Sequence, residues 1–511
     1  MKKFLIIALF LTGCSGLDIQ SAEFEDSKFW EKTFASEISY EMDESIRAMI
    51  VPSDLRVNEE INGFYAGLSI KPDLVVLMGV EDFAVEGETV LSCDDCIFQT
   101  TAGALMVDEE MVKKMKQDDL VEIMDEAFLQ ADSINVQTAF IREYLGEVPV
   151  LPLLFDRDFV GGQGHSEWLK ENLPANSLII ISTNFVEYLP FEMAQFYDLA
   201  AYTTMKNLDV VSAANINSEA ANVIAMMMGS LDGSGKVRRV AHKNSLDFEL
   251  EHLEDTTSYL FMTFADGEKE EMRRVSTLAF GSLPGGHDLG LYKGWAWDKN
   301  YDEALDLGVE KMLIDFRGRE DRALIGADFL AFDLIDNTCN FHEQNGMRVS
   351  YCKFVEGDKS FEEIEAEIFA ENEKSDVVYL IYKYADDELN SAAKQTAGLL
   401  VNAGVDIFVA QGLKGIHPVS MYEGSLILYG LGDFIREGGL ALEVNEDSEG
   451  VVVGISASDQ YFDLSLFPVS VVNGVPMLMD FSKRPGFAFN LVKDLNAVDR
   501  DIKSSWVRLQ R

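Results

Sequence analysis

Two short apolar runs, each just after a proline, constrain the fold most strongly. They are residues 71–80 (KPDLVVLMGV) and residues 177–183 (SLIIIST). Continuous apolar runs of this length are typical of parallel strands buried on both faces. An amphipathic stretch over 109–124 and another apolar segment over 148–154 lie between them. This alternation predicts an α/β fold in which helices cover a largely parallel sheet.

The same alternation returns in the second half of the chain. Strand-like segments occur at 276–281, 376–384 and 405–410, a helical stretch at 390–403, and short strands at 451–455, 463–467 and 475–479. The last strand is expected at a sheet edge, because Pro476 has no N–H to donate. A chain of 511 residues with 47% hydrophobic composition can bury at least two cores. Charged residues around 266–274 mark a boundary, so we predict two α/β domains, at 45–266 and 273–505.

The N-terminus has the features of an export signal. Lys2 and Lys3 precede an apolar run over 4–11, which spans only about 12 Å as a helix and is too short for a membrane span. The tetrapeptide at 11–14 (LTGC) resembles the lipobox of bacterial lipoproteins. That resemblance implies a signal peptide over 1–14, with Cys14 lipidated and made the new N-terminus. An ordinary secretory peptide is the alternative.

The lipobox implies a protein held by lipid at the extracytoplasmic face of the cell envelope, with residues 15–44 as a tether. No later run reaches the 18 or more apolar residues of a membrane helix, so the body is expected to be soluble. The formal net charge of −46 repels phosphate backbones. Nucleic acid is therefore excluded as an expected partner.

Four cysteines remain after Cys14: Cys93, Cys96, Cys339 and Cys352. Export permits disulfides, and the CDDC segment favours a local Cys93–Cys96 disulfide or two plain thiols. A redox motif is disfavoured because the two intervening aspartates would raise the thiol pKa values. A CxxC by itself also lacks two of the ligands of a tetrahedral zinc site.

The first domain resembles the Memo family, also called AmmeMemoRadiSam system protein B, which shares its fold with class III extradiol dioxygenases. Seven segments carry the resemblance in order: VPSDL (51–55), VLMGVEDF (76–83), TTAGALMVDEEMV (100–112), ADSINVQTAFI (131–141), VPVLPLLF (148–155), ISTNFVEYLPFEMAQFYD (181–198) and NSEAANVIAMMMG (217–229).

The departures from this family carry the functional information. The positions of its histidines hold Ser53, Asp82, Asp132 and Glu187, its aspartate falls on Asn184, and its cysteine falls near Ser218 or Glu219. Imidazole is a strong ligand for iron, copper or zinc and the usual proton shuttle. Oxygen activation is therefore not expected.

Two interpretations of this site remain. In one, Asp54, Asp82, Asp132 and Glu187 bind a hard cation such as calcium or magnesium through oxygen ligands. In the other, which we prefer in so acidic a chain, there is no metal or other cofactor and these carboxylates are solvated.

The second domain resembles the capsule-synthesis CapA-like proteins, relatives of calcineurin-type metallophosphatases with an α/β sandwich. The resemblance is strongest over 376–434 and includes YEGSLILYGLGDF (422–434). The metal ligands of that family are missing here as well. Its Gly-Asp falls on Gly281-Ser282, its strand-end histidine within 382–384, and its GHHPH on 410–414. Phosphoesterase chemistry, which needs two bridged cations, is not expected.

Both domains resemble metalloenzyme families, and both lack the metal ligands of those families. This favours a non-catalytic envelope lipoprotein, a pseudoenzyme that binds a peptide, glycan or protein partner. The alternative is a metal-dependent hydrolase of envelope polysaccharide, polyglutamate or phosphoester. In it, Asp82 and Glu187 would serve as metal ligands or as an acid and base pair.

Overall fold

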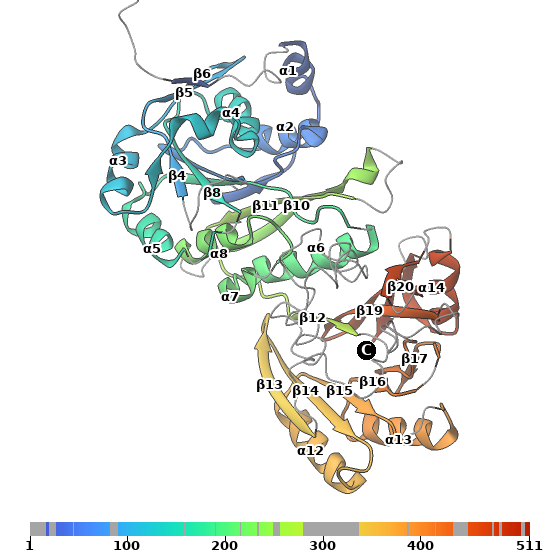
Figure 1. Ribbon diagram of the computed structural model, residues 1–511. Helices are drawn as coiled ribbons and strands as arrows, with labels where there is room; N and C mark the ends of the chain where they lie inside the picture. The colour runs from blue at the N-terminus through green and yellow to red at the C-terminus, as the bar shows by residue number, and fades with distance from the viewer. Residues whose placement is uncertain are drawn as a thin grey trace, which may run out of the picture. The chain divides into compact units, whose positions relative to one another are not determined.

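The computed structural model contains two compact units (Figure 1). Unit 1 is Met1–Thr183 with Phe261–Asp266, and unit 2 is Asn184–Leu260 with Gly267–Arg511. The structure describes residues 17–19, 27–43, 45–81, 90–157, 159–160, 162–189, 191–214, 216–231, 235–248, 256–279, 337–385, 388–413, 415–432, 448–472, 475–479, 483–501 and 506–511.

Unit 1 is built on the parallel strands that the apolar runs predict. They belong to an eight-stranded sheet of order β10-β11-β2-β9-β3-β8-β4-β7, in which β10 falls in the residue range of unit 2. Strands β2, β9, β3 and β8 pair in parallel and are buried almost throughout, which confirms the interpretation of the apolar runs. The bounds are β2 Ile46–Val51, β3 Leu74–Glu81, β4 Val90–Ser92, β7 Glu122–Ile123, β8 Val150–Asp156, β9 Ser177–Ser182, β10 Lys236–Asn244 and β11 Ser258–Ala265.

Three helices of unit 1 pack together through aromatic side chains: α1 (Ser27–Phe34), α2 (Asn58–Ala66) and α4 (Asp132–Leu145). Trp30 of α1 is buried, and its ring lies 5.2 Å from that of Phe140 on α4. Tyr65 of α2 stacks on the same Phe140 ring at 5.5 Å. Part of the segment 15–44, expected as a tether, therefore packs in the core of unit 1.

The helix expected over 109–124 is shorter in the structure. α3 spans Glu109–Gln117 and is capped at its N-terminus by Asp108. Asp119 then takes a left-handed conformation (φ 55°), and the N–H of Leu120 donates to the carbonyl of Met115. This is the hydrogen-bond pattern of a Schellman C-cap. The helix therefore ends at Gln117, and β7 follows at Glu122.

The other elements of unit 1 are small. A three-stranded sheet has the order β1-β5-β6. The bounds are β1 Leu17–Ile19, β5 Cys96–Thr100, β6 Gly103–Met106, η2 Leu55–Val57, η3 Asp125–Leu129 and α5 Gln163–Asn172.

Unit 2 contains a helical part and two six-stranded sheets, of orders β12-β19-β20-β23-β22, with β21 paired to β20, and β13-β14-β15-β16-β18-β17. Its helices are α6 Phe191–Lys206, α7 Val210–Ala213, α8 Ala221–Ser230, η4 Ser245–Asp247, α12 Phe361–Lys374, α13 Ser391–Asn402 and α14 Arg484–Val492. Its strands are β12 Arg274–Ala279, β13 Thr338–Gln344, β14 Met347–Val355, β15 Val377–Lys383, β16 Ile407–Gln411, β17 Ser420–Tyr422, β18 Ser425–Leu428, β19 Ser448–Ser458, β20 Tyr461–Val472, β21 Val475–Leu478, β22 Ala497–Asp501 and β23 Trp506–Gln510.

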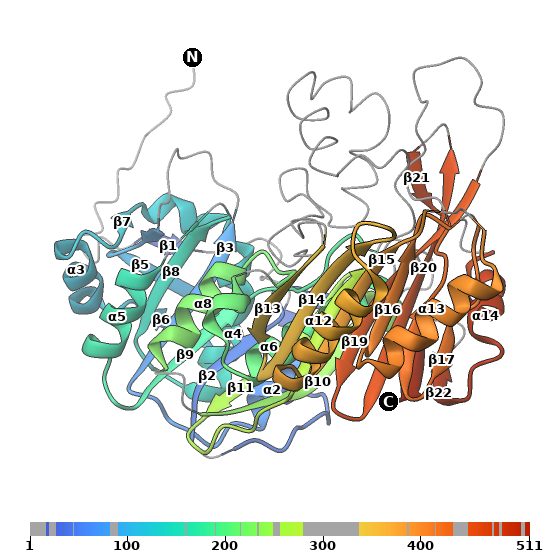
Figure 2. The same cartoon turned by 90° about the horizontal axis from the view of Figure 1, so that it is seen from below.

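Alternating side chains of β15 divide unit 2 between two cores. Val378 and Leu380 pack with α12 and α13, which lie on the same face of the β14-β15-β16 sheet (Figures 1 and 2). Val377 and Tyr379 pack on the opposite face, in a core shared with β19 and β20. The two-residue period of a strand accounts for this division. The C-terminal strands are confirmed, and β21, which contains Pro476, pairs only with β20 among the described strands.

Among the described residues, we find no helix both long enough and apolar enough to cross a membrane.

Candidate functional site

The carboxyl ends of the parallel strands in unit 1 lie in register. Ser182 of β9 is the partner of Val51 at the end of β2, and also of Gly79 in β3. Two residues further along β3, Glu81 is the partner of Asp156 in β8. In open α/β sheets this edge is where ligands bind. It is also where the resemblance places the family's metal.

A buried amide joins two of these strand ends. Gln137 of α4 donates from Nε2 to the carbonyl oxygen of Pro52 (2.8 Å) and to Oγ of Ser182 (3.0 Å). Its Oε1 accepts from the hydroxyl of Tyr65 at 2.9 Å. Burial raises the pKa of Tyr65 well above its usual value, so this phenol stays protonated and donates. The three contacts bind α4 and α2 to the sheet edge.

The carboxylate of Glu81 sits against the first turn of α4. Its Oε1 accepts from the backbone N–H of Ser133 (3.0 Å) and from Oγ of Ser133 (2.9 Å). A carboxylate at a helix N-terminus satisfies orphan N–H groups and complements the helix dipole. Asp132, one of the expected oxygen ligands, is the first residue of α4 and is exposed.

Asp54, another expected oxygen ligand, is strongly engaged by its own neighbour. It accepts from the backbone N–H of Arg56 at 2.8 Å, which caps η2. Its Oδ2 also accepts a hydrogen bond from Nε of Arg56 at 2.7 Å and lies 2.6 Å from Nη2 of the same guanidinium. The guanidinium neutralises this carboxylate and would repel a cation placed on the same oxygen atoms. Ser53, before it, is half-buried.

The remaining described positions of the resemblance lie in unit 2. Asn184 is buried and donates from Nδ2 to Oε1 of Glu187 at 3.1 Å. Its carbonyl oxygen accepts from Oγ of buried Ser218 at 2.9 Å. Cys14, Asp82 and Ser282 lie outside the described residues. The oxygen-ligand set that includes Asp82 therefore stays a prediction.

The sequence did not predict one polar cluster in unit 2, formed by Asp198, His242 and Ser258. The buried carboxylate of Asp198 accepts from Oγ of Ser258 (2.6 Å) and contacts Nε2 of His242 (2.8 Å). Serine, histidine and aspartate are the components of a hydrolytic triad, but here the aspartate stands between the other two. The imidazole therefore does not reach the hydroxyl, whose oxygen accepts from the N–H of Val186 at 3.0 Å. The cluster fastens α6 to β11 and has no nucleophile–base pair.

The donor chemistry at the strand ends does not fit the metal that the Memo resemblance implies. No position of the resembled motif holds a histidine in the sequence. Of its described carboxylates, Asp54 is paired with a guanidinium and Glu187 accepts from the amide of Asn184. The neighbouring Glu81 caps a helix. We derive no step through a metal at this edge.

Two cysteines and a carboxylate gather elsewhere in unit 1. The sulfur atoms of Cys93 and Cys96 are joined as a disulfide. Among the described residues, the group of metal-ligand side chains that comes together is Cys93, Cys96 and Asp125, with ligand atoms all within 4.8 Å of one another. Sequence reasoning missed Asp125, because 29 positions separate it from Cys96 and only strand pairing connects them. The second cysteine pair, Cys339 and Cys352, forms a disulfide between β13 and β14.

The comparisons with known proteins concern the N-terminal part of the chain. Residues 16–260 match the family model described as Memo-like protein. The chain is 26% identical over 156 residues to a MEMO1 family protein of Pyrobaculum aerophilum, which covers 29% of this chain and 54% of that protein. It is 28% identical over 185 residues to a MEMO1 family protein of Methanopyrus kandleri, covering 32% of this chain and 63% of that protein.

The chain thus spans less than two thirds of the length of these curated relatives. A crystal structure of a hypothetical protein from Thermus thermophilus matches at 10% identity and a TM-score of 0.20, over 26% of this chain and 61% of that chain. A likeness at that level says nothing about the fold. On the family match and the two relatives, the N-terminal part of this chain carries a Memo-like domain.

Proposed function

We propose that this chain is a lipid-anchored protein of the extracytoplasmic envelope face whose Memo-like domain binds a peptide, glycan or protein partner without catalysis. Its second domain, on the CapA-like resemblance, would serve binding in the same way.

The observation that carries the proposal is the pairing of polar groups at the strand ends of unit 1. Gln137 makes three hydrogen bonds there, Asp54 is held by Arg56, and Glu81 caps α4. A catalytic metal site instead needs donor atoms that converge on one open position. Groups satisfied by one another stabilise the edge and leave its surface for recognition.

The two disulfides support an extracytoplasmic location. Cys93–Cys96 and Cys339–Cys352 are each joined in the structure. Disulfides persist in oxidising compartments and are rare where thiol reductants are abundant. This agrees with the export signal and the lipobox resemblance at Cys14.

The charge narrows the partner class. At −46, the protein repels anionic polymers at distances shorter than the Debye length, which is about 8 Å at physiological ionic strength. Neutral glycans and neutral or basic peptides are the partners that this surface admits.

The test is turnover by the full-length chain, purified without chelators and supplied with calcium, magnesium, manganese or zinc. Phosphoesters, envelope polysaccharide and polyglutamate are the substrates that the hydrolase alternative names. We expect no metal-dependent turnover of any of them. Turnover that is lost in Asp82→Ala and kept in Cys93→Ser/Cys96→Ser would overturn the proposal. The second variant excludes metal bound by the cysteine cluster.

A further inference from the structure

The cysteine–aspartate cluster of unit 1 is assembled by strand pairing. β4 and β7 run parallel, with Leu91 opposite Glu122 and Ser92 opposite Ile123. The N–H of Met124 then donates to the carbonyl of Ser92 at 3.0 Å. This register carries Cys93, the residue after β4, to Asp125, the first residue of η3. Cys96 returns at the start of β5, with its Cα 5.9 Å from that of Cys93.

The three side chains offer the donors of a thiolate-rich metal site. Both cysteines are buried and Asp125 is half-buried. Zinc takes tetrahedral ligands at about 2.3 Å for sulfur and about 2.0–2.2 Å for carboxylate oxygen, so its ligand atoms lie roughly 3.5–3.8 Å apart. Ligand atoms already within 4.8 Å of one another need only small side-chain rotations to reach that spacing. The backbone N–H of Asp94 contacts Oδ1 of Asp125 at 3.3 Å and orients the carboxylate.

The surrounding charge favours a cation at this position. The carboxylates of Asp94, Asp95 and Glu126 lie near Asp125 and add negative charge around it. A bound divalent cation compensates this charge together with that of the two thiolates and the carboxylate.

From this geometry we infer that Cys93, Cys96 and Asp125 form a redox-gated site for a thiophilic divalent cation of the zinc class. The disulfide is its oxidised, metal-free form. The reduced form binds one ion through two thiolates and one carboxylate oxygen, with the fourth position open to water. The site is not expected to bind calcium or magnesium, because these ions prefer oxygen donors alone. The site is separate from the strand-end residues of the proposed function.

The interconversion is balanced with a dithiol reductant. The reductant delivers two electrons and two protons, the Cys93–Cys96 sulfur–sulfur bond breaks, and the reductant leaves as its own disulfide. Metal binding then releases the two thiol protons as the two metal–sulfur bonds form. Reoxidation by a disulfide of higher potential expels the ion.

Zinc titration of the full-length chain tests the inference, with Cys14→Ser as the background of every sample. The chain is reduced with a dithiol, freed of reductant without oxygen, and titrated with zinc against a chromophoric chelator. We expect one tight zinc per reduced chain and none per oxidised chain. Cobalt should give thiolate-to-metal charge-transfer absorption in the reduced sample only.

The variants isolate the site. Cys93→Ser/Cys96→Ser should abolish tight binding, while Cys339→Ser/Cys352→Ser, the matched control, should retain it. Asp125→Asn, an isosteric change that preserves the fold, should weaken zinc binding about 10- to 100-fold, as the two thiolates remain. Circular dichroism checks that each variant is folded.

Three results would overturn the inference: no tight zinc on the reduced chain, loss of binding in the Cys339/Cys352 control, or unchanged affinity in Asp125→Asn.

Discussion

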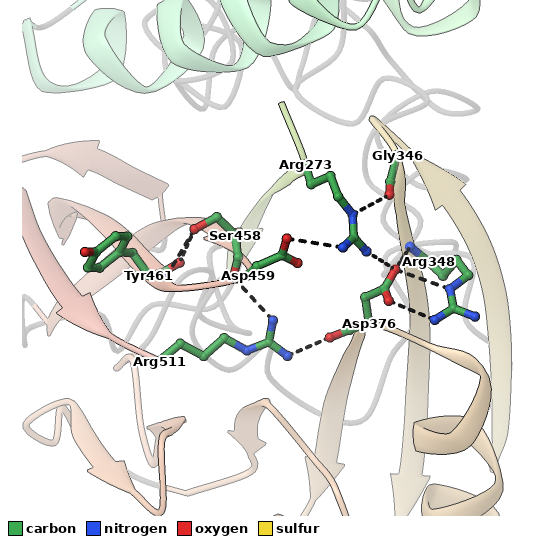
Figure 3. Close-up of polar contacts among 8 residues, drawn as sticks. All are labelled: Arg273, Gly346, Arg348, Asp376, Ser458, Asp459, Tyr461 and Arg511. Carbon is green, nitrogen blue, oxygen red and sulfur yellow. Dashed lines mark hydrogen bonds and ion pairs between the residues drawn. The ribbon is translucent and has the colours of Figure 1, made fainter. Parts of the chain in front are cut away.

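Asp376, just before the central strand β15, is a carboxylate that pairs with two arginines in unit 2. Its carboxylate accepts from the N–H of Arg348 at 2.8 Å and from Nη2 of Arg348 at 2.8 Å. Nη2 of Arg273 lies 2.8 Å from the same group, and Arg511 donates to its backbone oxygen (Figure 3). Arg348 first, and then Arg273, hold the pKa of Asp376 well below its usual range. The carboxylate of Asp376 thus connects Arg273, the residue before β12, to Arg348 of β14, and its backbone carbonyl binds Arg511.

Replacing Asp376 with asparagine should lower the free energy of unfolding by about 1–2 kcal/mol at pH 7, since charged hydrogen bonds are lost at a partly exposed site. The pKa is depressed in the folded state. Its contribution is therefore present above the unfolded value, about 3.9, and is lost as pH falls toward the folded value. Urea unfolding at pH 7 and at about pH 3 measures both.

The matched control is Asp459→Asn, because Asp459 pairs with the same Arg273 at 3.2 Å but is half exposed. This substitution should lower the free energy of unfolding by less than about 0.5 kcal/mol. A wild-type advantage over Asp376→Asn that persists undiminished at about pH 3 would contradict the charge-based account.

In unit 1, Gln137 likewise connects several elements through one polar side chain. Gln137→Leu keeps the volume but removes the partners of Tyr65, Ser182 and Pro52, all buried. Buried groups left unpaired cost about 1–3 kcal/mol each, less after relaxation, so we expect a loss of about 2–4 kcal/mol. Thermal and urea unfolding measure it. Gln163→Leu should be close to neutral, because the Gln163 amide donates to the exposed carboxylate of Glu167. Equal effects of the two variants would show that the Gln137 network contributes little.

At the level of elements, the strands could be predicted and their partners could not. Runs such as 74–81 and 177–182 are buried on both faces, so continuous apolarity identified them. The end of α3 depends on a left-handed Asp119, which no apolar period encodes. The approach of Asp125 to Cys93 depends on the β4–β7 register, and pairing between distant segments is not written in local sequence. Asp125, the carboxylate that joins the two cysteines, was missed for that reason.

The contact between β3 and α4 gives a prediction at this scale. A Cβ on Gly79 would clash with Oγ of Ser133, at the first turn of α4. Gly79→Ala should therefore displace the helix and cost about 1–3 kcal/mol. In a Ser133→Gly background, which removes Oγ and Cβ of Ser133 and leaves Cδ1 of Ile134 at 3.1 Å, the same substitution should cost measurably less. A double-mutant cycle from urea unfolding gives the coupling. If the cost is the same in both backgrounds, the two elements are not in this close contact.

For the whole molecule, the predictions of a mixed α/β fold and a Memo-like N-terminal part are both supported. These follow from patterns spread over hundreds of residues, which tolerate loss of individual side chains. The CapA-like assignment of the second domain stays a prediction, as do the oxygen-ligand set and the lipid anchor. The oxygen-ligand set and the lipid anchor each depend on a few residues, and Cys14, Asp82 and Ser282 lie outside the described part of the chain. Site chemistry is carried by single residues, so it is the first information that divergence removes.

The lipid anchor is the prediction that belongs to the molecule as a whole, because it fixes where unit 1 works. Leu17 of β1 pairs with Cys96 and follows Cys14 by three positions, so a lipid there would hold β5 within roughly 10 Å of the membrane surface. Mass spectrometry of the mature N-terminal peptide should find acyl chains on Cys14. Cys14→Ser should abolish them and move the protein out of the detergent phase, while Cys339→Ser should change neither. A mature chain that begins elsewhere, or carries an unmodified Cys14, would exclude the anchor and with it the membrane-proximal position of the cysteine cluster.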